Sequence, residues 1–131
     1  MINSASEVIM YFLKIEADFS AALYLSNSHD RYRGMHGHDF SVSLTLCKEE
    51  LSESGMVYDY KIVKNTLDTI TESLDHILLN DKSEFIEKNP TVENIAKFIF
   101  DEMNRQLVDL PLYEVQVSQF KGLSAYYRPK V

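Results

Sequence analysis

Met35-His36-Gly37-His38-Asp39-Phe40 opens a segment of regular alternation that continues as Ser41-Val42-Ser43-Leu44-Thr45-Leu46-Cys47. Successive side chains of a β-strand point to opposite faces and rise about 3.3 Å each. The alternation therefore predicts a strand over residues 36–47, with both histidines on the face of the apolar side chains. Two imidazoles at that spacing can reach one metal ion, whereas zinc takes about four ligands. The motif is either half of a metal site or a pair of polar residues where a strand begins.

Strands are also predicted before and after this segment. Residues 8–23 alternate, which indicates a half-buried strand, and the polar residues 26–34 indicate a loop. Residues 113–118 alternate again, and a short last strand is expected around residues 125–128. The apolar face of the first strand comprises Tyr11, Leu13, Ile15, Ala17, Phe19, Ala21 and Leu23.

Two helices are predicted in the middle of the chain. Asp59 is placed to cap a helix over residues 60–74, and Thr91 to cap a second helix that ends before Pro111. Residues 77–89, between them, look irregular. The order strand, strand, helix, helix, strand, strand predicts an α+β fold in which antiparallel strands present one face to a helical layer. The predicted buried stripes are Ile62, Val63, Leu67, Ile70 and Leu74 in the first helix and Ile95, Phe98, Ile99, Met103 and Leu107 in the second.

Composition limits the classes of function. The 131 residues suit one domain, expected over residues 1–131, and 45% of them are hydrophobic, which is enough for a core. A formal charge of −7 argues against binding to a nucleic-acid backbone, which needs clustered Lys and Arg. The single cysteine, Cys47, has no partner for an internal disulfide, and no long apolar run or signal-peptide pattern is present. We therefore expect a soluble cytoplasmic protein that binds neither nucleic acid nor membrane.

Five short blocks of sequence, taken in order, resemble those of a known family. They are Phe19-Ser20-Ala21-Ala22, Met35-His36-Gly37-His38-Asp39-Phe40, Gly55-Met56-Val57-Tyr58-Asp59-Tyr60, Leu74-Asp75-His76-Ile77-Leu78-Leu79-Asn80 and Pro90-Thr91-Val92-Glu93-Asn94-Ile95-Ala96. In this order and spacing they resemble the signature blocks of the 6-pyruvoyl-tetrahydropterin synthase family, which includes the 6-carboxytetrahydropterin synthase of the queuosine route. The resemblance implies the tunnelling fold, a four-stranded antiparallel sheet backed by two helices. It also implies that subunits pair their sheets into a barrel, usually as two stacked trimers.

The resemblance implies a zinc site that this chain matches only in part. Enzymes of the family bind zinc through three histidines, and His36 and His38 match the second and third of them. The first falls on Leu23, whose side chain cannot ligate a metal. His29 is the nearby residue that can supply a third nitrogen; the alternative is a solvated loop histidine. Zinc is therefore expected as a cofactor only if His29 completes the site.

The family's catalytic base is also replaced. The resemblance places a cysteine thiolate four residues before the first histidine of the motif, where this chain has Tyr32. A phenol has an ordinary pKa near 10, so it is a far weaker base at neutral pH. Some branches of the family use an acid in this loop, which makes Asp30 a candidate base; the alternative is a surface acid. Cys47 lies on the opposite face of its strand and does not take this role.

Asp75 and His76 match the pair that supports the proton relay in this family. The carboxylate would orient the imidazole so that its other nitrogen exchanges a proton. Without the resemblance, the same pair at a helix end would be a cap and a histidine in favourable contact with the helix dipole.

The residue that anchors the pterin ring is changed as well. The resemblance places a glutamate at Gln119, where the family's carboxylate accepts two hydrogen bonds from the ring. An amide offers one acceptor and one donor, so the preferred ring should change. Glu93 matches an acid of the block at residues 90–96, although an acid in the first turn of a helix has a sufficient structural explanation.

Three family positions, Leu23, Tyr32 and Gln119, therefore depart together while the blocks that define the fold remain. The leading hypothesis is a diverged relative that keeps the fold and the pocket but lacks the zinc-dependent synthase reaction. It would bind a pterin- or purine-like small molecule, or a partner protein. The alternative is a working pterin lyase that acts on dihydroneopterin triphosphate or a related pterin, with metal on three histidines and Asp30 or Tyr32 working with His76. The third hypothesis is a structural oligomer.

Overall fold

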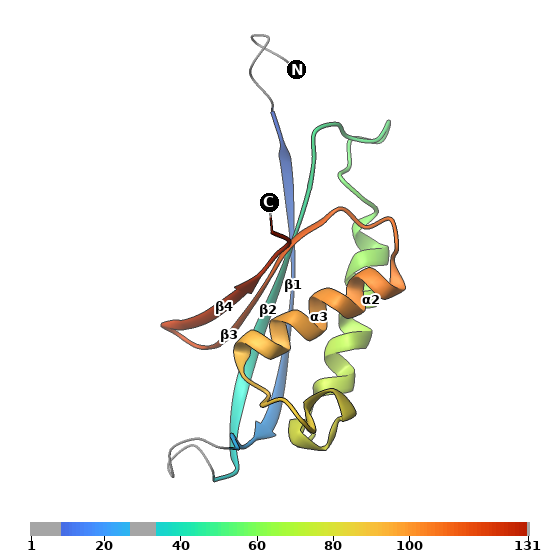
Figure 1. Cartoon of the computed structure of the whole chain (residues 1–131). Helices are drawn as coiled ribbons and strands as arrows, with labels where there is room; N and C mark the ends of the chain where they lie inside the picture. The colour runs from blue at the N-terminus through green and yellow to red at the C-terminus, as the bar shows by residue number, and fades with distance from the viewer. Residues whose placement is uncertain (1–8, 27–33, 131) are drawn as a thin grey trace.

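The computed structural model describes residues 9–26 and 34–130, and its elements follow the predicted order (Figure 1). Each helix begins at the residue after its predicted cap, the first ends at Leu74 as expected, and the second ends at Gln106, before Pro111. In chain order the elements are β1 (Tyr11–Leu23), β2 (His36–Lys48), α2 (Tyr60–Leu74), the short 3-10 helices η1 (Leu79–Asp81) and η2 (Ser83–Phe85), α3 (Val92–Gln106), β3 (Leu112–Phe120) and β4 (Leu123–Tyr127).

The four strands form one antiparallel sheet in the order β1-β2-β3-β4. Strands β1 and β2 pair along their whole length, from Tyr11 opposite Lys48 to Leu23 opposite His36. Helix α2 packs on β1, and α3 packs on β3 and β4. Both helices lie on the same face of the sheet, and within the described residues no element covers the other face (Figure 1).

The last strand differs from the prediction because of a tight turn. Strand β4 begins at Leu123, two residues earlier than expected, and Leu123 pairs with Phe120. Gly122 adopts a φ of 99°, a conformation that is easy for glycine and strained for other residues. The turn is therefore short enough for the two strands to pair immediately after it.

The core lies between the sheet and the helices, on the face that the alternation predicted. Phe40, Leu44 and Leu46 of β2 are at most 1% exposed. Two details of the prediction are wrong. Ile62 is 46% exposed, because the stripe of α2 that faces the sheet passes through Val63 and Thr71 instead. Tyr11 is 42% exposed, because β1 starts beyond the end of the helical layer (Figure 1).

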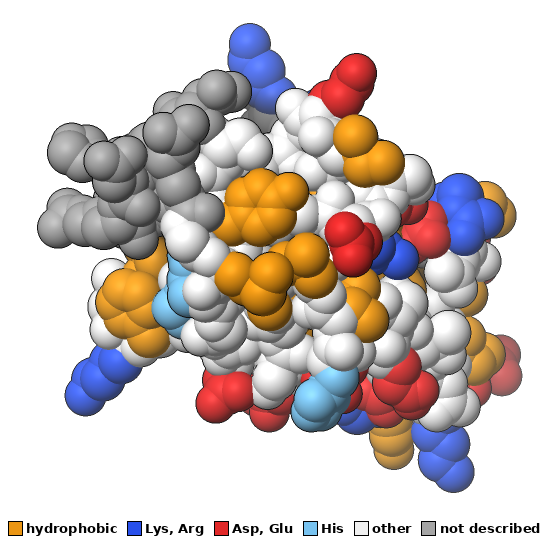
Figure 2. All heavy atoms as spheres, turned by 90° about the horizontal axis from the view of Figure 1, so that it is seen from below, with side chains coloured by type: hydrophobic (Ala, Val, Ile, Leu, Met, Phe, Trp, Pro, Cys, Tyr) orange, Lys and Arg blue, Asp and Glu red, His pale blue; other side chains and the backbone are white. Residues whose placement is uncertain are grey.

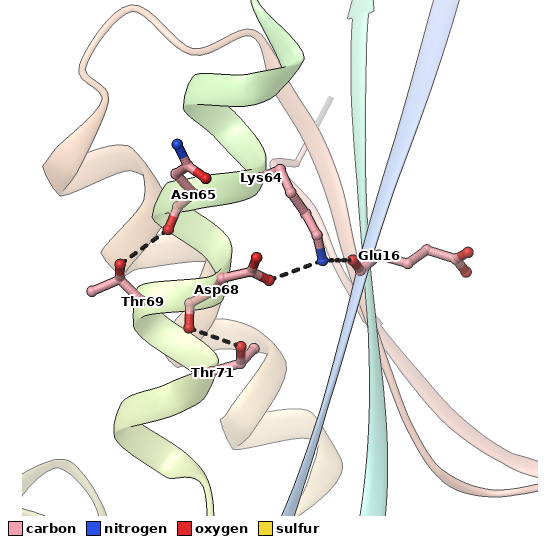
Figure 3. Close-up of polar contacts among 6 residues, drawn as sticks. All are labelled: Glu16, Lys64, Asn65, Asp68, Thr69 and Thr71. Carbon is pink, nitrogen blue, oxygen red and sulfur yellow. Dashed lines mark hydrogen bonds and ion pairs between the residues drawn. The ribbon is translucent and has the colours of Figure 1, made fainter.

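Polar contacts hold the helices in place. The Lys64 ammonium donates to the backbone carbonyl of Glu16 on β1 at 2.7 Å, and Asp68 holds the same ammonium at 2.9 Å (Figure 3). Asp59 caps α2 by accepting from the backbone N–H of Lys61.

Neither α2 nor α3, the α-helices in the described part of the chain, is long and apolar enough to span a membrane.

Candidate functional site

His36 and His38 lie at the start of β2 with their side chains on the core side of the sheet. Their rings meet edge to face, with 4.8 Å between the centroids. The Nδ1 atom of His36 is 2.7 Å from the carbonyl oxygen of Gly34. Because a carbonyl only accepts, Nδ1 carries the hydrogen, and Nε2 of the neutral ring is left with a free lone pair. This is the orientation that ligating histidines commonly take.

Leu23 stands opposite these histidines. Its Cα is the register partner of His36 on β2, and its side chain is 2% exposed. An isobutyl group therefore lies opposite the motif, at the position where the resemblance predicts the first histidine. In the described ranges 9–26 and 34–130, no group of three His, Cys, Asp or Glu side chains can hold a metal ion. These residues do not fit a three-histidine zinc site.

A cavity of about 650 Å³ joins most of the predicted ligand residues. His36 and His38 enter it from β2, Glu93 from the first turn of α3, and Gln119 from the end of β3. Glu93 is exposed, whereas Gln119 is half-buried. Apolar residues form the walls of the cavity, and sequence reasoning singled out few of them as site residues. The wall residues are Leu23, Leu25, Met35, Pro90, Val92, Phe120 and Leu123.

Local hydrogen bonds bring α3 to this cavity. The Thr91 hydroxyl accepts from the backbone N–H of Asn94 at 3.1 Å and so caps the helix. The side chain of Asn89 pairs with both backbone groups of Ser26, which fastens the segment before α3 to the chain that follows β1. The first turn of α3 is thereby held beside the end of the sheet, where Glu93 reaches the cavity.

His38 is more readily deprotonated than an ordinary histidine. Burial is the main cause, and the neighbouring His36 adds to it, while Asp39 acts in the opposite direction. The net effect lowers the pKa of His38 below its usual value of 6.5. At neutral pH the ring is therefore predominantly uncharged and can donate through one nitrogen and accept through the other.

Asp75 and His76 form the predicted pair, at the edge of β1. The Asp75 carboxylate accepts from His76 Nδ1 at 2.8 Å and from the backbone N–H of Ser20 at 2.8 Å. The hydrogen bond from Ser20 and the one from His76 lower the pKa of Asp75. The backbone N–H of His76 donates to Ser20 O, and its φ is 57°, so the turn that ends α2 presents the ring outward. The His76 side chain is 82% exposed.

This pair does not line the cavity that holds Gln119. His76 borders a different cleft of about 490 Å³, together with Ser20, Gly37 and Asp39. His38 is the one predicted site residue among the described residues that lines both spaces. Figure 2 views this end of the molecule, and histidine side chains reach its surface at two separate places. Within the described chain, Gln119, predicted to bind a ring, and His76, predicted to transfer a proton, thus line separate spaces that share His38.

Two polar residues that sequence reasoning missed lie in the second cleft. Ser20 and Asp39 are register partners on β1 and β2, and the Ser20 hydroxyl donates to the Asp39 carboxylate. Both alternate with core residues, so the pattern placed them on the uncovered face of the sheet without indicating that they would meet.

The remaining candidates are of two kinds. His29, Asp30 and Tyr32 lie outside the described residues, so their roles stay predictions. Cys47 is half-buried at the far end of β2, opposite Phe12, while His36 pairs with Leu23 at the other end. Its position agrees with a structural role.

Known proteins resemble this chain, some of them over nearly its whole length. The family model for 6-pyruvoyl tetrahydropterin synthase matches residues 12–130. A 6-carboxy-5,6,7,8-tetrahydropterin synthase from Synechocystis is 32% identical over 128 residues, which cover 93% of this chain and 97% of that protein. A dihydroneopterin monophosphate aldolase from Pyrococcus furiosus is 33% identical over 78 residues, 60% of this chain and 63% of the aldolase. The 6-pyruvoyl tetrahydropterin synthase of Caenorhabditis elegans has the same fold, with a TM-score of 0.80 at 24% identity and coverage of 94% and 98%.

Proposed function

The chain belongs to the 6-pyruvoyl tetrahydropterin synthase family, and from this premise we propose that it is a diverged member without the zinc-dependent synthase reaction. The family acts on pterins and is typically oligomeric. In this proposal the chain keeps the ring-binding cavity and uses it for a pterin- or purine-like small molecule.

The position of Leu23 carries the proposal. Its buried side chain lies directly opposite His36, and the family resemblance predicts the first zinc ligand at this position. A catalytic zinc site takes three protein ligands and keeps one open position for the reacting group. Two imidazoles leave such an ion without one of those three ligands. Zinc in this family would polarise the oxygens of the pterin side chain, and no such step is assigned to this chain.

Gln119 adds a second, independent reason. Its amide lies in the cavity, and the resemblance predicts at this position a glutamate that accepts two hydrogens from the ring. An amide cannot make that pair of bonds, so the ring that fits this cavity differs in at least one hydrogen-bonding group. The absence of one predicted zinc-binding residue and the change of the predicted ring-anchoring residue fall in one site. Together they support a change of the bound small molecule more than they support random drift at one position.

Metal content and turnover test the proposal together. Protein purified from zinc-supplemented medium without chelator should carry far less than about one zinc per chain, and it should not turn over dihydroneopterin triphosphate. A stoichiometric zinc that His36→Ala removes, together with turnover, would contradict the proposal. A bicyclic ring that binds with micromolar affinity and is displaced by cavity substitutions would support it.

A working pterin lyase is the second candidate, and the Asp75–His76 pair favours it. The carboxylate holds the imidazole at 2.8 Å, as a proton relay requires, and His38 borders the same cleft. This candidate needs His29 as the third metal ligand and Asp30 or Tyr32 as the base. If the protein turns over a pterin, His76→Ala should lower kcat strongly and leave ring binding in place. If it neither binds a ring nor turns one over, a structural or partner-binding role remains.

We also propose that residues 1–131 form one domain and that copies assemble as two stacked trimers. The free backbone edges of a sheet favour pairing with another chain. Here β1 and β4 are edge strands, and one face of the sheet is bare of described elements (Figure 1). Closure of several sheets into a barrel would remove the edges and enclose that polar face.

A further inference from the structure

Four hydrogen bonds of Asn89 join the chain that follows β1 to the start of α3. Its side-chain Oδ1 accepts from the backbone N–H of Ser26 at 2.8 Å, and its Nδ2 donates to the carbonyl of the same residue at 2.9 Å. Its own backbone carbonyl accepts from the N–H of Thr91 at 2.9 Å and from Nδ2 of Asn94 at 2.8 Å. One residue therefore holds together two segments that are far apart in the sequence.

The bonds from this side chain continue a pattern that runs along the edge of β1. On the side away from β2, residues 75–77 bond the backbone groups of residues 20–22. Tyr24 is next in the alternation, and the side-chain amide of Asn80 bonds both of its backbone groups, at 2.9 and 3.0 Å. Asn89 serves the following position in the same way. An amide side chain offers one acceptor and an N–H donor, as a peptide group does, so it can replace a neighbouring strand.

The two segments that Asn89 joins form two walls of the cavity. Leu25 lines the cavity from the chain after β1, and Val92 lines it from the first turn of α3. Leu25 lies past the last register pair of the two strands, in which Leu23 is opposite His36. Pairing with β2 therefore does not fix the first of these walls within the described chain, and the side-chain amides do.

We propose that Asn89 is a positioning residue for the ring that the cavity binds, because its side-chain amide sets the spacing between Leu25 and the first turn of α3. The inference rests on the proposed ring-binding function. It adds a residue that does not itself line the cavity and acts through the two walls that it joins.

The spacing matters because apolar walls bind a flat ring by close contact. A gap of 0.5–1 Å already forfeits roughly a quarter to a half of the dispersion energy of a contact. Asn89→Ala removes both bonds to Ser26, and each neutral hydrogen bond corresponds to roughly a factor of five in an equilibrium constant. The apparent Kd rises as the fraction of chains with the correct spacing falls. We therefore expect a ring affinity about tenfold lower in this variant.

Asn89→Asp separates the amide from the bulk of the side chain. A carboxylate of nearly the same shape still accepts from the Ser26 N–H, but it cannot donate to the Ser26 carbonyl. This variant should therefore also bind the ring more weakly than the wild type. Wild-type affinity in Asn89→Asp overturns the inference, because the amide donor would then have no part in the spacing.

The test is a fluorescence titration of the full chain with pterin and with 2-aminopurine, in the wild type and both Asn89 variants. Tyr58→Phe is the matched control. It removes the 2.8 Å hydrogen bond to Asp109, which lies beyond the other end of α3. The control should lose free energy of unfolding in urea, as the Asn89 variants do, and should keep the wild-type ring affinity.

A double-mutant cycle tests whether Asn89 acts through the wall that it holds. Leu25→Ala removes the side chain whose position Asn89 is proposed to set. In that background, Asn89→Ala should weaken ring binding by much less than it does in the wild type, because residues that act through one another are not additive. Equal effects in the two backgrounds overturn the inference.

The remaining outcomes separate this inference from the function on which it rests. Unchanged ring affinity in Asn89→Ala overturns the inference and leaves the ring-binding function standing. An equal loss of affinity in Tyr58→Phe does the same, because general destabilisation would then explain the effect. If wild-type protein binds neither pterin nor 2-aminopurine, the inference fails together with the proposed function.

Discussion

Leu23 offers a direct experiment at the scale of single residues. Leu23→His should create a three-histidine zinc site, because position 23 faces His36 across the β1–β2 pair. Without metal, the variant should lose about 2–4 kcal/mol of unfolding free energy, since it removes a buried isobutyl group and buries a polar ring. Zinc binds the folded state selectively and should raise the melting temperature of this variant.

The control for that variant is Leu13→His. Leu13 lies on the same face of β1 but pairs with Leu46, at the opposite end from the histidines. The same substitution there should give no zinc-dependent rise in melting temperature. Equal responses of the two variants to zinc would show that the histidine pair does not contribute, and would remove the structural reason for the proposed loss of the metal site.

The lowered pKa of His38 predicts the direction in which stability changes with pH. Its pKa is lowered in the folded chain, mainly by burial, so the unfolded chain takes up the proton more readily. The contribution of His38 to the free energy of unfolding is fully present above about pH 6.5. It is lost as the pH falls from there through the lowered pKa of the folded state. Urea unfolding in the presence of EDTA checks this effect. Between pH 7.5 and pH 5.5, His38→Gln should lose less free energy of unfolding than the wild type. Identical losses would contradict this account.

At the scale of elements, the start of α3 connects stability to the site. The Thr91 hydroxyl caps this helix, and two residues later Glu93 reaches the cavity. Thr91→Ala should lower the free energy of unfolding by about 1 kcal/mol, because a helix N–H loses its partner. Thr91→Ser keeps the oxygen and should stay close to wild type in the same urea titration. A similar loss in both variants would instead point to packing of the Thr91 methyl group.

At the scale of the whole molecule, the free edge of β1 makes the proposed assembly testable. Ser20 and Ala22 use their backbone groups on the side away from β2, where residues 75–77 cover them. By the same alternation the backbone N–H of Phe12 also points away from β2, beyond that covered stretch. This start of β1 is therefore available for a strand of another copy.

Phe12→Pro should break the assembly without unfolding the chain. Proline removes an N–H that β2 does not use, and proline is tolerated on edge strands. Sedimentation should show about 91 kDa for the wild type, from six chains of 15.2 kDa, and a much smaller species for the variant. Phe12→Val also removes the ring that meets Tyr113 edge to face but keeps the N–H, so it should assemble. A wild type that sediments as a monomer would rule out the proposed hexamer.

Local patterns in the sequence were enough to predict the strands and α-helices of this protein, but not the 3-10 helices η1 and η2. Alternation over residues 36–47 and the caps Asp59 and Thr91 predicted β2, α2 and α3, because side-chain periodicity and capping depend on neighbours within one turn or one strand. The same spacing correctly put His36 and His38 on one face, and the family blocks correctly indicated the fold. Ile62 was misplaced because periodicity alone does not say which edge of an apolar stripe meets the sheet.

The amino-acid sequence by itself thus determined the order of elements, the faces of the strands and the list of candidate site residues. Only the tertiary structure decided which of those residues meet. It brought Leu23 opposite His36 through the β1–β2 register, and it placed Glu93 and Gln119 around one cavity. It also placed His76 at the edge of β1, in a separate cleft. These contacts join segments far apart in the chain, so they depend on strand register and helix packing, which no local pattern specifies.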